Sequence, residues 1–257
     1  KILCDAGLLR RIRQGSWVFY RSVTKGAEAE FLHFLTTVMP GTHPTIQLDH
    51  QRLLELKNER LRAAAQYFEK TAVEWDSIRT LHVEDLDIER ALQRCVLEAR
   101  PRKLLDIGTG TGRILEVLGP YVEDAEGVDF SHEMLTVARA NLDKPSLGHC
   151  RVRHGDMYQL PFQDRSFHFI TIHHVLHFAH QPQQVLKEAA RVLRTQGQVV
   201  IVDFASHVRE ELRTKFKHQR LGFSNDEIEG WLDQIGLRMQ PPTKFTGEPL
   251  AIVIWTG

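Results

Sequence analysis

Short apolar segments alternate with helical patterns over the second half of the chain. From Lys103 onward, six runs have the length and apolar content of strands: 103–107, 125–129, 150–154, 167–173, 197–204 and 249–256. Apolar residues at helical spacing fall between these runs, near 112–119, 131–141, 182–194, 206–216 and 225–235. This alternation predicts an α/β fold with a mainly parallel sheet that helices cover on both faces.

The first hundred residues follow a different pattern. Residues 1–23 predict the end of a helix, stopped at Gly7, and then a two-stranded ribbon whose second strand is the apolar run 17–20. Residues 24–100 are mostly helical in pattern and are broken near the middle by prolines and a glycine. Because no cap precedes Lys1, we expect the chain to begin partway through a domain.

Length and composition limit the function only broadly. A chain of 257 residues with 42% hydrophobic residues and no formal net charge predicts one catalytic domain of medium size with an appendage. No apolar run has the length of a membrane span, and the three cysteines are widely separated. We therefore expect a cytoplasmic protein without a disulfide framework.

The strongest chemical signal is the run 104–112, L-L-D-I-G-T-G-T-G, where a strand passes through a glycine-rich turn into a helix. Glycines let the backbone turn tightly and approach a ligand closely. A dinucleotide fingerprint needs its third glycine at the position of Arg113. Asp106, just before the loop, would repel a pyrophosphate but suits the ammonium and sulfonium groups of S-adenosylmethionine. The loop favours that cofactor, and a dinucleotide-dependent oxidoreductase stays as a rival interpretation.

Residues 103–205 resemble class I S-adenosylmethionine-dependent methyltransferases through ordered motifs. D-I-G-T-G-T-G is similar to their first motif, D-F-S-x-x-M-L at 129–135 to the next, and G-D-M with L-P-F at 155–162 to the third. The resemblance implies a Rossmann-like fold over residues 101–257, a mostly parallel seven-stranded sheet flanked by helices. It also implies a cofactor site made of Asp106, Gly108, Thr109, Gly110, Asp129, Phe130, Met134, Asp156, Met157 and His173.

Individual roles follow from the same resemblance. Asp129, which ends the second strand, would accept hydrogen bonds from both ribose hydroxyls, a role that its position also favours. Phe130 and Met134 would flank the adenine, and Asp156 would bind its amino group. The backbone of Met157 would bond a ring nitrogen, and the end of the fourth strand, at His173, would lie beside the methionine part.

Residues 1–24 resemble the end of an ArsR-type winged helix-turn-helix domain. L-C-D-A-G-L-L at 3–9 is similar to the end of the recognition helix, and the basic stretch 10–20 to the wing. Most base-reading residues would then be missing, which leaves Arg11 and Arg13 to contact DNA phosphates. An ordinary basic surface hairpin is the alternative. Residues 25–100 would form a helical linker or lid, and the whole chain resembles fusions of this domain with a methyltransferase.

The acceptor side is less defined by the sequence. Phe68 and Trp75 are candidates for a lid over the cofactor, or for helix packing. Histidines supply the other candidates: His207 as a general base, and His174, His177 and His218 as residues lining the acceptor site. No clustered cysteine or carboxylate accompanies them in the sequence, so we expect no metal.

Together these patterns predict a methyltransferase that uses S-adenosylmethionine and acts on a small-molecule acceptor. We expect a homodimer, no membrane association, and contact with DNA through the N-terminal segment. The alternative is a transcriptional regulator that senses S-adenosylmethionine or S-adenosylhomocysteine without turnover. The acceptor atom, whether oxygen, nitrogen, carbon or sulfur, has no signature in the chain.

Overall fold

The computed structural model describes residues 1–14, 17–23, 26–38, 44–52, 55, 85–216, 218–246 and 250–257. The chain divides into two compact units, residues 1–59 and 60–257. No helix among the described residues is both long and apolar enough to span a bilayer.

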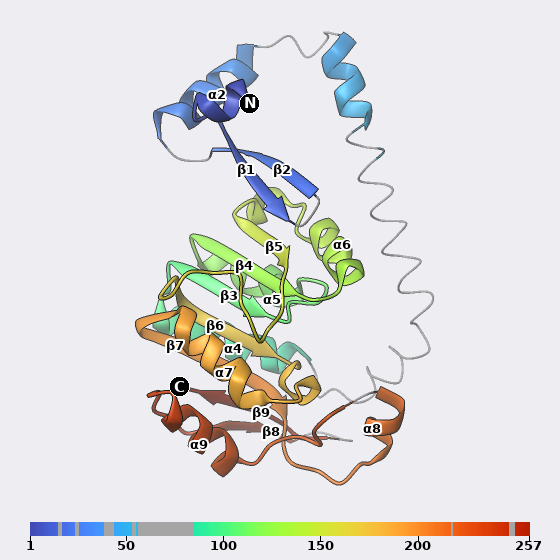
Figure 1. Cartoon of the computed structure of the whole chain (residues 1–257), viewed down its shortest axis with the longest axis vertical. Coiled ribbons are helices and arrows are strands. Elements are labelled where there is room, and N and C mark those ends of the chain that lie inside the picture. Colours follow the sequence, from blue (N-terminus) through green and yellow to red (C-terminus); the bar gives the residue numbers. More distant parts are fainter. Residues whose placement is uncertain are drawn as a thin grey trace. The chain divides into compact units, whose positions relative to one another are not determined.

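The first unit begins with a short helix and a hairpin (Figure 1). Helix α1 (Ile2–Asp5) leads into strands β1 (Leu9–Gln14) and β2 (Trp17–Ser22), which pair antiparallel from Leu9 opposite Ser22 to Gln14 opposite Trp17. Helix α2 (Ala27–Val38) follows, and residues 44–52 are also helical. The predicted helix end and two-stranded ribbon are confirmed.

The second unit is built on a sheet of seven strands in the order β5-β4-β3-β6-β7-β9-β8 (Figure 1). The strands are β3 (Lys103–Ile107), β4 (Asp124–Asp129), β5 (Cys150–His154), β6 (Phe167–His173), β7 (Leu193–Phe204), β8 (Thr243–Phe245) and β9 (Ile252–Thr256). Strands β3 to β7 are parallel, and β9 runs antiparallel to both of its neighbours. The predicted mostly parallel, seven-stranded α/β fold is confirmed.

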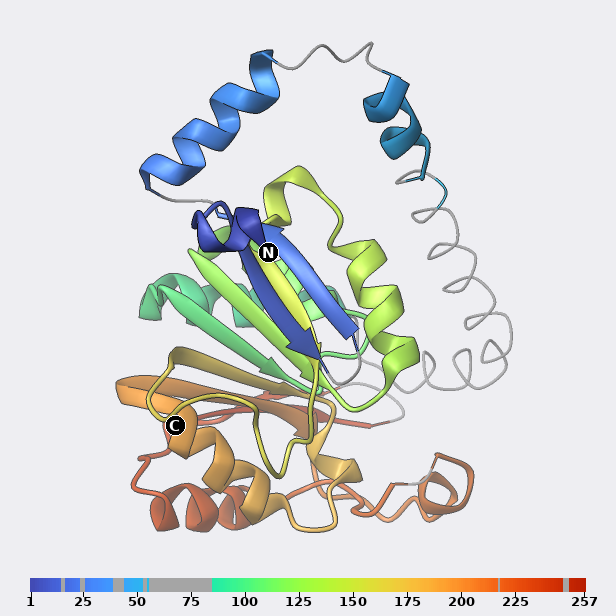
Figure 2. The same cartoon turned by 45° about the horizontal axis from the view of Figure 1, so that its top comes forward.

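Helices lie on both sides of this sheet, as the two views show (Figures 1 and 2). They are α4 (Asp85–Ala99), α5 (Arg113–Leu118), α6 (His132–Asn141), α7 (Pro182–Val192), α8 (Glu211–Phe216) and α9 (Asn225–Gln234), with short 3-10 turns η1 (Gly119–Tyr121), η2 (Pro145–Leu147) and η3 (Leu176–Phe178). Since successive strand residues point to opposite faces, Leu104 joins a core with α4, α5 and α6. Leu105 and Ile107 join a second core with α7 and α9.

Four features of the elements differ from the sequence prediction. The edge strand β8 was not predicted, because its three residues are too short and too polar to produce a strand pattern. Strand β7 begins at Leu193 rather than at 197, since Leu193 already pairs with Phe167. Helix α8 begins at Glu211 rather than at 206. Helix α4 was grouped with the linker, and its residues Ile88, Leu92 and Val96 pack in the core of the second unit.

Candidate cofactor and acceptor site

The glycine-rich loop after β3 combines tight packing with open space. Gly108 has a φ of +71°, and a Cβ atom there would lie 2.2 Å from Cγ2 of Val175. Gly110 also has a positive φ, +52°, but a Cβ built on it meets no atom of the described residues within 4 Å. Gly108 is therefore required by packing, whereas Gly110 borders a space that a ligand could occupy.

Asp129 is held at this open position by two backbone groups. The Gly110 N–H donates to its Oδ2 at 2.8 Å, and the Ser131 N–H donates to its Oδ1 at 2.8 Å. The side chain is half-buried, and each carboxylate oxygen has a second lone pair. Asp129 is thus fixed at the end of β4, beside the loop, with acceptor capacity left for a ligand.

Asp106 lies deeper than the loop that follows it. Its side chain is 1% exposed, and the Thr171 hydroxyl donates to its Oδ1 at 2.7 Å. Burial raises the pKa of Asp106 from 3.8 to about 6, against the opposing effect of the Thr171 hydrogen bond. A cation nearby would favour the charged form, so the site is electrostatically suited to a positively charged ligand group.

Aromatic side chains gather beside Asp129 at the ends of β4 and β5. Phe130 is 72% exposed, and its ring centre lies 5.3 Å from that of His154. His132 stacks on the same His154 ring at 4.2 Å. Met134, at the start of α6, donates its N–H to the Ser131 hydroxyl. His132 and His154 were not predicted as site residues; their only sequence signal was position, since His154 pairs with Asp129 across the sheet.

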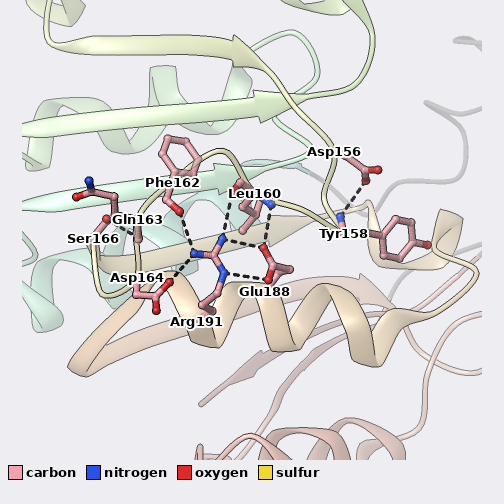
Figure 3. A network of polar contacts seen from close by, with 9 residues as sticks. All are labelled: Asp156, Tyr158, Leu160, Phe162, Gln163, Asp164, Ser166, Glu188 and Arg191. Carbon is pink, nitrogen blue, oxygen red and sulfur yellow. Dashed lines mark hydrogen bonds and ion pairs between the residues drawn. The ribbon is translucent and has the colours of Figure 1, made fainter.

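Asp156 lies in an exposed loop that Arg191 fastens to α7 (Figure 3). The Arg191 guanidinium donates to Glu188 twice, to Asp164 once, and to the carbonyl oxygens of Leu160 and Phe162. These bonds and the carboxylates raise the pKa of Arg191 further above its usual range.

The loop itself is ordered by its own side chains. The Tyr158 N–H donates to Asp156 Oδ1 at 2.9 Å, and the Tyr158 hydroxyl accepts from the His180 N–H at 2.8 Å. Met157 packs half-buried against the core that contains α7. The loop that carries Asp156 and Met157 is therefore positioned by α7, a contribution that the motif alone did not reveal.

Arg113, which replaces the third glycine of a dinucleotide fingerprint, has a structural partner. Its guanidinium forms two hydrogen bonds to Glu89 of α4, at 2.7 and 2.8 Å. Glu89 is 9% exposed, so the pair fixes α4 against the start of α5. The glycine loop is thereby anchored to a helix that precedes the sheet in sequence.

The ends of β6 and β7 bring the predicted acceptor-site histidines together. His173 ends β6, and His174 follows it with a φ of +52°, a left-handed conformation uncommon outside glycine. His177 lies in η3, and its Nδ1 is 2.7 Å from Oδ1 of Asp203 on β7. The His177 N–H also donates to Asp203 Oδ2 at 3.1 Å. Asp203 was not predicted as a site residue, although an acid near a strand end was a usable signal.

His218 and His207 join this group from the segment after β7. The His218 ring lies 4.1 Å from that of His177, between centroids, and burial, followed by the effect of His177, lowers the pKa of His218 to about 4. Burial also lowers the pKa of His207, whose Nδ1 accepts the Arg209 N–H at 3.2 Å. Both imidazoles are neutral at pH 7.

The remaining predicted site residues lie in the first unit or in the glycine loop itself, or are not among the described residues. Phe68 and Trp75 fall outside the described residues. Arg11 is exposed on β1 of the first unit, and the side chain of Arg13 is not among those described. Thr109 is buried, and its N–H and that of Gly108 both donate to the Val128 carbonyl, which fastens the loop to β4.

Comparison with known proteins finds methyltransferases. Residues 105–201 match the model of a methyltransferase domain. The uncharacterized methyltransferase YcgJ of Bacillus subtilis is 34% identical over 120 residues, 47% of this chain and 46% of YcgJ. The demethylmenaquinone methyltransferase of Thermotoga maritima is 33% identical over 145 residues, 54% of this chain and 61% of that protein. The chain therefore matches about half the length of these relatives.

The structural comparison agrees on the fold. An S-adenosylmethionine-dependent methyltransferase from Clostridium acetobutylicum has a TM-score of 0.60 and 15% identity, with coverage of 74% of this chain and 97% of that one. The second unit therefore includes the stretch that matches the methyltransferase-domain model, and it has the Rossmann-like fold of these methyltransferase structures.

Proposed function

We propose that this chain transfers a methyl group from S-adenosylmethionine to a small molecule. The observation that supports this most is Asp129, held by the Gly110 and Ser131 N–H groups beside the open position at Gly110. A carboxylate that backbone N–H groups hold in place can accept hydrogen bonds from both hydroxyls of a ribose without a change in its own position. The two methyltransferase relatives support the same activity.

The remaining cofactor contacts follow the same edge of the sheet. S-adenosylmethionine, when bound, supplies an electrophilic methyl group on a sulfonium. Phe130 and Met134 would flank the adenine next to Asp129, with Asp156 and the Met157 backbone at its polar edge. Asp106 would stabilise the positive charges from beneath the loop, and Gly108, Thr109 and His173 would shape the space for the methionine part.

Catalysis on this scaffold depends mainly on positioning and on exclusion of water. An acceptor that must lose a proton needs a base, and His207 is our candidate for this role. Its Nδ1 accepts the Arg209 N–H in the described structure, so the Nε2 of the neutral ring carries the proton. To take a proton from an oxygen, nitrogen or sulfur acceptor, the ring would release the Arg209 N–H and use Nδ1, or change tautomer and use Nε2.

Binding of S-adenosylhomocysteine by calorimetry tests the cofactor site. Replacement Asp129→Ala should weaken binding by about 1–3 kcal/mol, because ribose hydroxyls lose a charged acceptor. Glu229→Ala, an exposed acid on α9, is the matched control and should bind like the unmodified chain. If Asp129→Ala and Glu229→Ala bind S-adenosylhomocysteine with equal affinity, Asp129 does not contact the cofactor.

Methyl transfer itself needs a separate test, because a ligand-sensing regulator would also bind S-adenosylhomocysteine. The chain is incubated with S-adenosylmethionine labelled on the methyl group and a bacterial metabolite extract. We expect label to appear in a small molecule and to disappear with Asp129→Ala. Binding without any transfer in extracts of several bacteria would favour the sensor.

We also propose that the first unit contacts DNA. Its helix and hairpin, α1, β1 and β2, have the arrangement expected for the end of a winged helix, and Arg11 is exposed on β1. Arg11→Ala should weaken duplex binding, and the slope of log affinity against log salt concentration should fall in magnitude by about 1, the value for one lost phosphate contact. Lys187→Ala, an exposed cation of α7, is the control, and no binding at low salt would exclude the proposal.

A further inference from the structure

Two stretches of the chain, 174–177 and 203–218, bring histidines and a carboxylate to one place. His174 follows β6, His177 lies in η3, Asp203 is on β7, and His207 and His218 come from the connection to α9. One ring nitrogen of His174, one of His177 and one oxygen of Asp203 all lie within 4.8 Å of one another. We propose that His174, His177 and Asp203 bind one divalent transition metal ion.

The donor set suits such an ion. Imidazole nitrogen and carboxylate oxygen are common ligands of Zn²⁺, Fe²⁺ and Co²⁺, and two histidines with one carboxylate form a recurring three-ligand site. Three protein ligands leave at least one coordination position for water or for an atom of a bound molecule. The sequence places no carboxylate close to the histidines, so no metal was expected, but the fold supplies one in Asp203.

Burial gives a reason for a cation at this place. Asp203 is 0% exposed and His177 is 3% exposed, and polar side chains at such depth need partners. The described structure balances Asp203 by N–H groups of His177 and Phe204 and by the His177 ring. Binding of the ion would replace the 2.7 Å bond between His177 Nδ1 and Asp203 by bonds from each residue to the metal.

A second observation also indicates a missing ligand. His218 is 7% exposed, its ring packs on His177, and its Nδ1 forms no hydrogen bond with any described residue. A buried ring nitrogen without a partner is costly, and an ion or its bound water nearby would satisfy it. His174 has a left-handed backbone, and its N–H donates to the Val202 carbonyl. An uncommon backbone conformation of this kind is typical of a residue whose side chain must be held in one direction to bind a ligand.

The experiment uses the whole chain without a histidine tag, stripped by a chelator, and Zn²⁺ alone as the probe. Calorimetry and elemental analysis after dialysis should find one Zn²⁺ per chain. His174→Ala should lower the affinity about 100-fold or more, since it removes one of three ligands while leaving the side chains of the fully buried pair in place. Asp203→Asn should have a similar effect.

His180→Ala is the matched control, because His180 is an exposed histidine three residues after His177 whose side chain lies outside the triad. Its affinity for Zn²⁺ should equal that of the unmodified chain. Far-UV circular dichroism and S-adenosylhomocysteine binding show separately whether each variant folds and whether the cofactor site is intact.

Co²⁺ substitution gives a readout that a structural role would not change. The visible bands of bound Co²⁺ should indicate four or five ligands without thiolate charge transfer, and His174→Ala should alter them. The proposal is overturned by absence of stoichiometric Zn²⁺ binding, by equal binding in His174→Ala and His180→Ala, or by thiolate bands that assign the ion to a cysteine. Because the metal is measured without cofactor, failure here leaves the methyltransferase proposal untouched.

Discussion

The carboxyl ends of β3 and β4 differ from those of β6 and β7 in how their polar groups are partnered. At β3 and β4, Asp129 accepts backbone hydrogen bonds from Gly110, 19 positions earlier, and from Ser131, two positions later. At β6 and β7, Asp203 is bonded to the backbone and ring of His177, 26 positions earlier, and to the backbone of Phe204, the next residue. Both regions join separate segments of the chain, but two sequence motifs mark the first region, whereas no motif marks the second.

The two regions also differ in what their buried groups lack. Asp106 is a buried acid with a raised pKa, which a bound cation would relieve. His218 is a buried imidazole with an unpartnered nitrogen, as far as the described residues show. Both carry a stability cost that a ligand could offset, one on each side of the edge where the strands end. The sequence indicated a functional acid at Asp106, but it did not indicate that a ring nitrogen of His218 would be buried without a partner among the described residues.

The largest expected effect is a loss of stability when alanine replaces Gly108, which is closely packed, rather than Gly110, which borders open space. Gly108→Ala should lower the free energy of unfolding by about 2–4 kcal/mol, because the new Cβ would lie 2.2 Å from Val175 in a left-handed backbone. Gly110→Ala should cost only about 1–2 kcal/mol, since no described atom lies near its Cβ. Urea unfolding measures both, and Val175→Ala should partly rescue Gly108→Ala. Equal costs for the two glycines would contradict this division.

The next effect tests the charge buried under the loop. Asp106 has a pKa of about 6 in the folded protein, above its ordinary 3.8, so the folded state holds the proton more tightly than the unfolded state. Its contribution to stability is present below pH 4 and is lost as the pH rises through 6. Asp106→Asn should therefore raise the stability of the ligand-free protein at pH 7 by up to about 3 kcal/mol.

The same variant should lose that advantage at pH 4 and should bind S-adenosylhomocysteine more weakly at pH 7. Thermal unfolding at several pH values, with Asp226→Asn on α9 as an exposed control, measures the first effect. A gain that is independent of pH would show that Asp106 is not a buried ionised acid.

A smaller effect concerns the loop that carries Asp156. Arg191→Ala removes five hydrogen bonds and leaves Glu188 without its cation, so we expect a loss of about 2 kcal/mol in stability. Cofactor affinity should fall as well, because the loop of Asp156 and Met157 would lose its anchor on α7. Arg194→Ala, an exposed neighbour, serves as control. Unchanged amide hydrogen exchange over residues 156–162 in Arg191→Ala would show that Arg191 does not hold that loop in place.

The smallest effect tests the histidine side. His218→Phe replaces an unpartnered buried nitrogen by an apolar ring next to Phe178 and Phe204, so we expect the metal-free chain to gain about 1 kcal/mol in stability. Chemical denaturation in the presence of a chelator measures it. A clear loss instead would mean that the His218 ring forms a polar contact that the static structure does not contain.

The alternation of strands and helices and the local motifs determined much of this protein. The parallel sheet, the glycine loop, and the positions of Asp106 and Asp129 at strand ends follow from patterns within a few residues, since strand period and turn chemistry are local. The edge strand β8 was missed because three residues, two of them polar, are too few to carry such a pattern.

Only the tertiary structure decided which distant residues meet. Arg113 meets Glu89, Arg191 meets the loop of Asp156, and Asp203 meets His174 and His177 through tertiary packing, 24 to 29 positions apart in several of these pairs. No local period encodes such a meeting, because it depends on strand order and on which face each side chain takes. The chain by itself therefore defined the class of site, and the fold decided its neighbours.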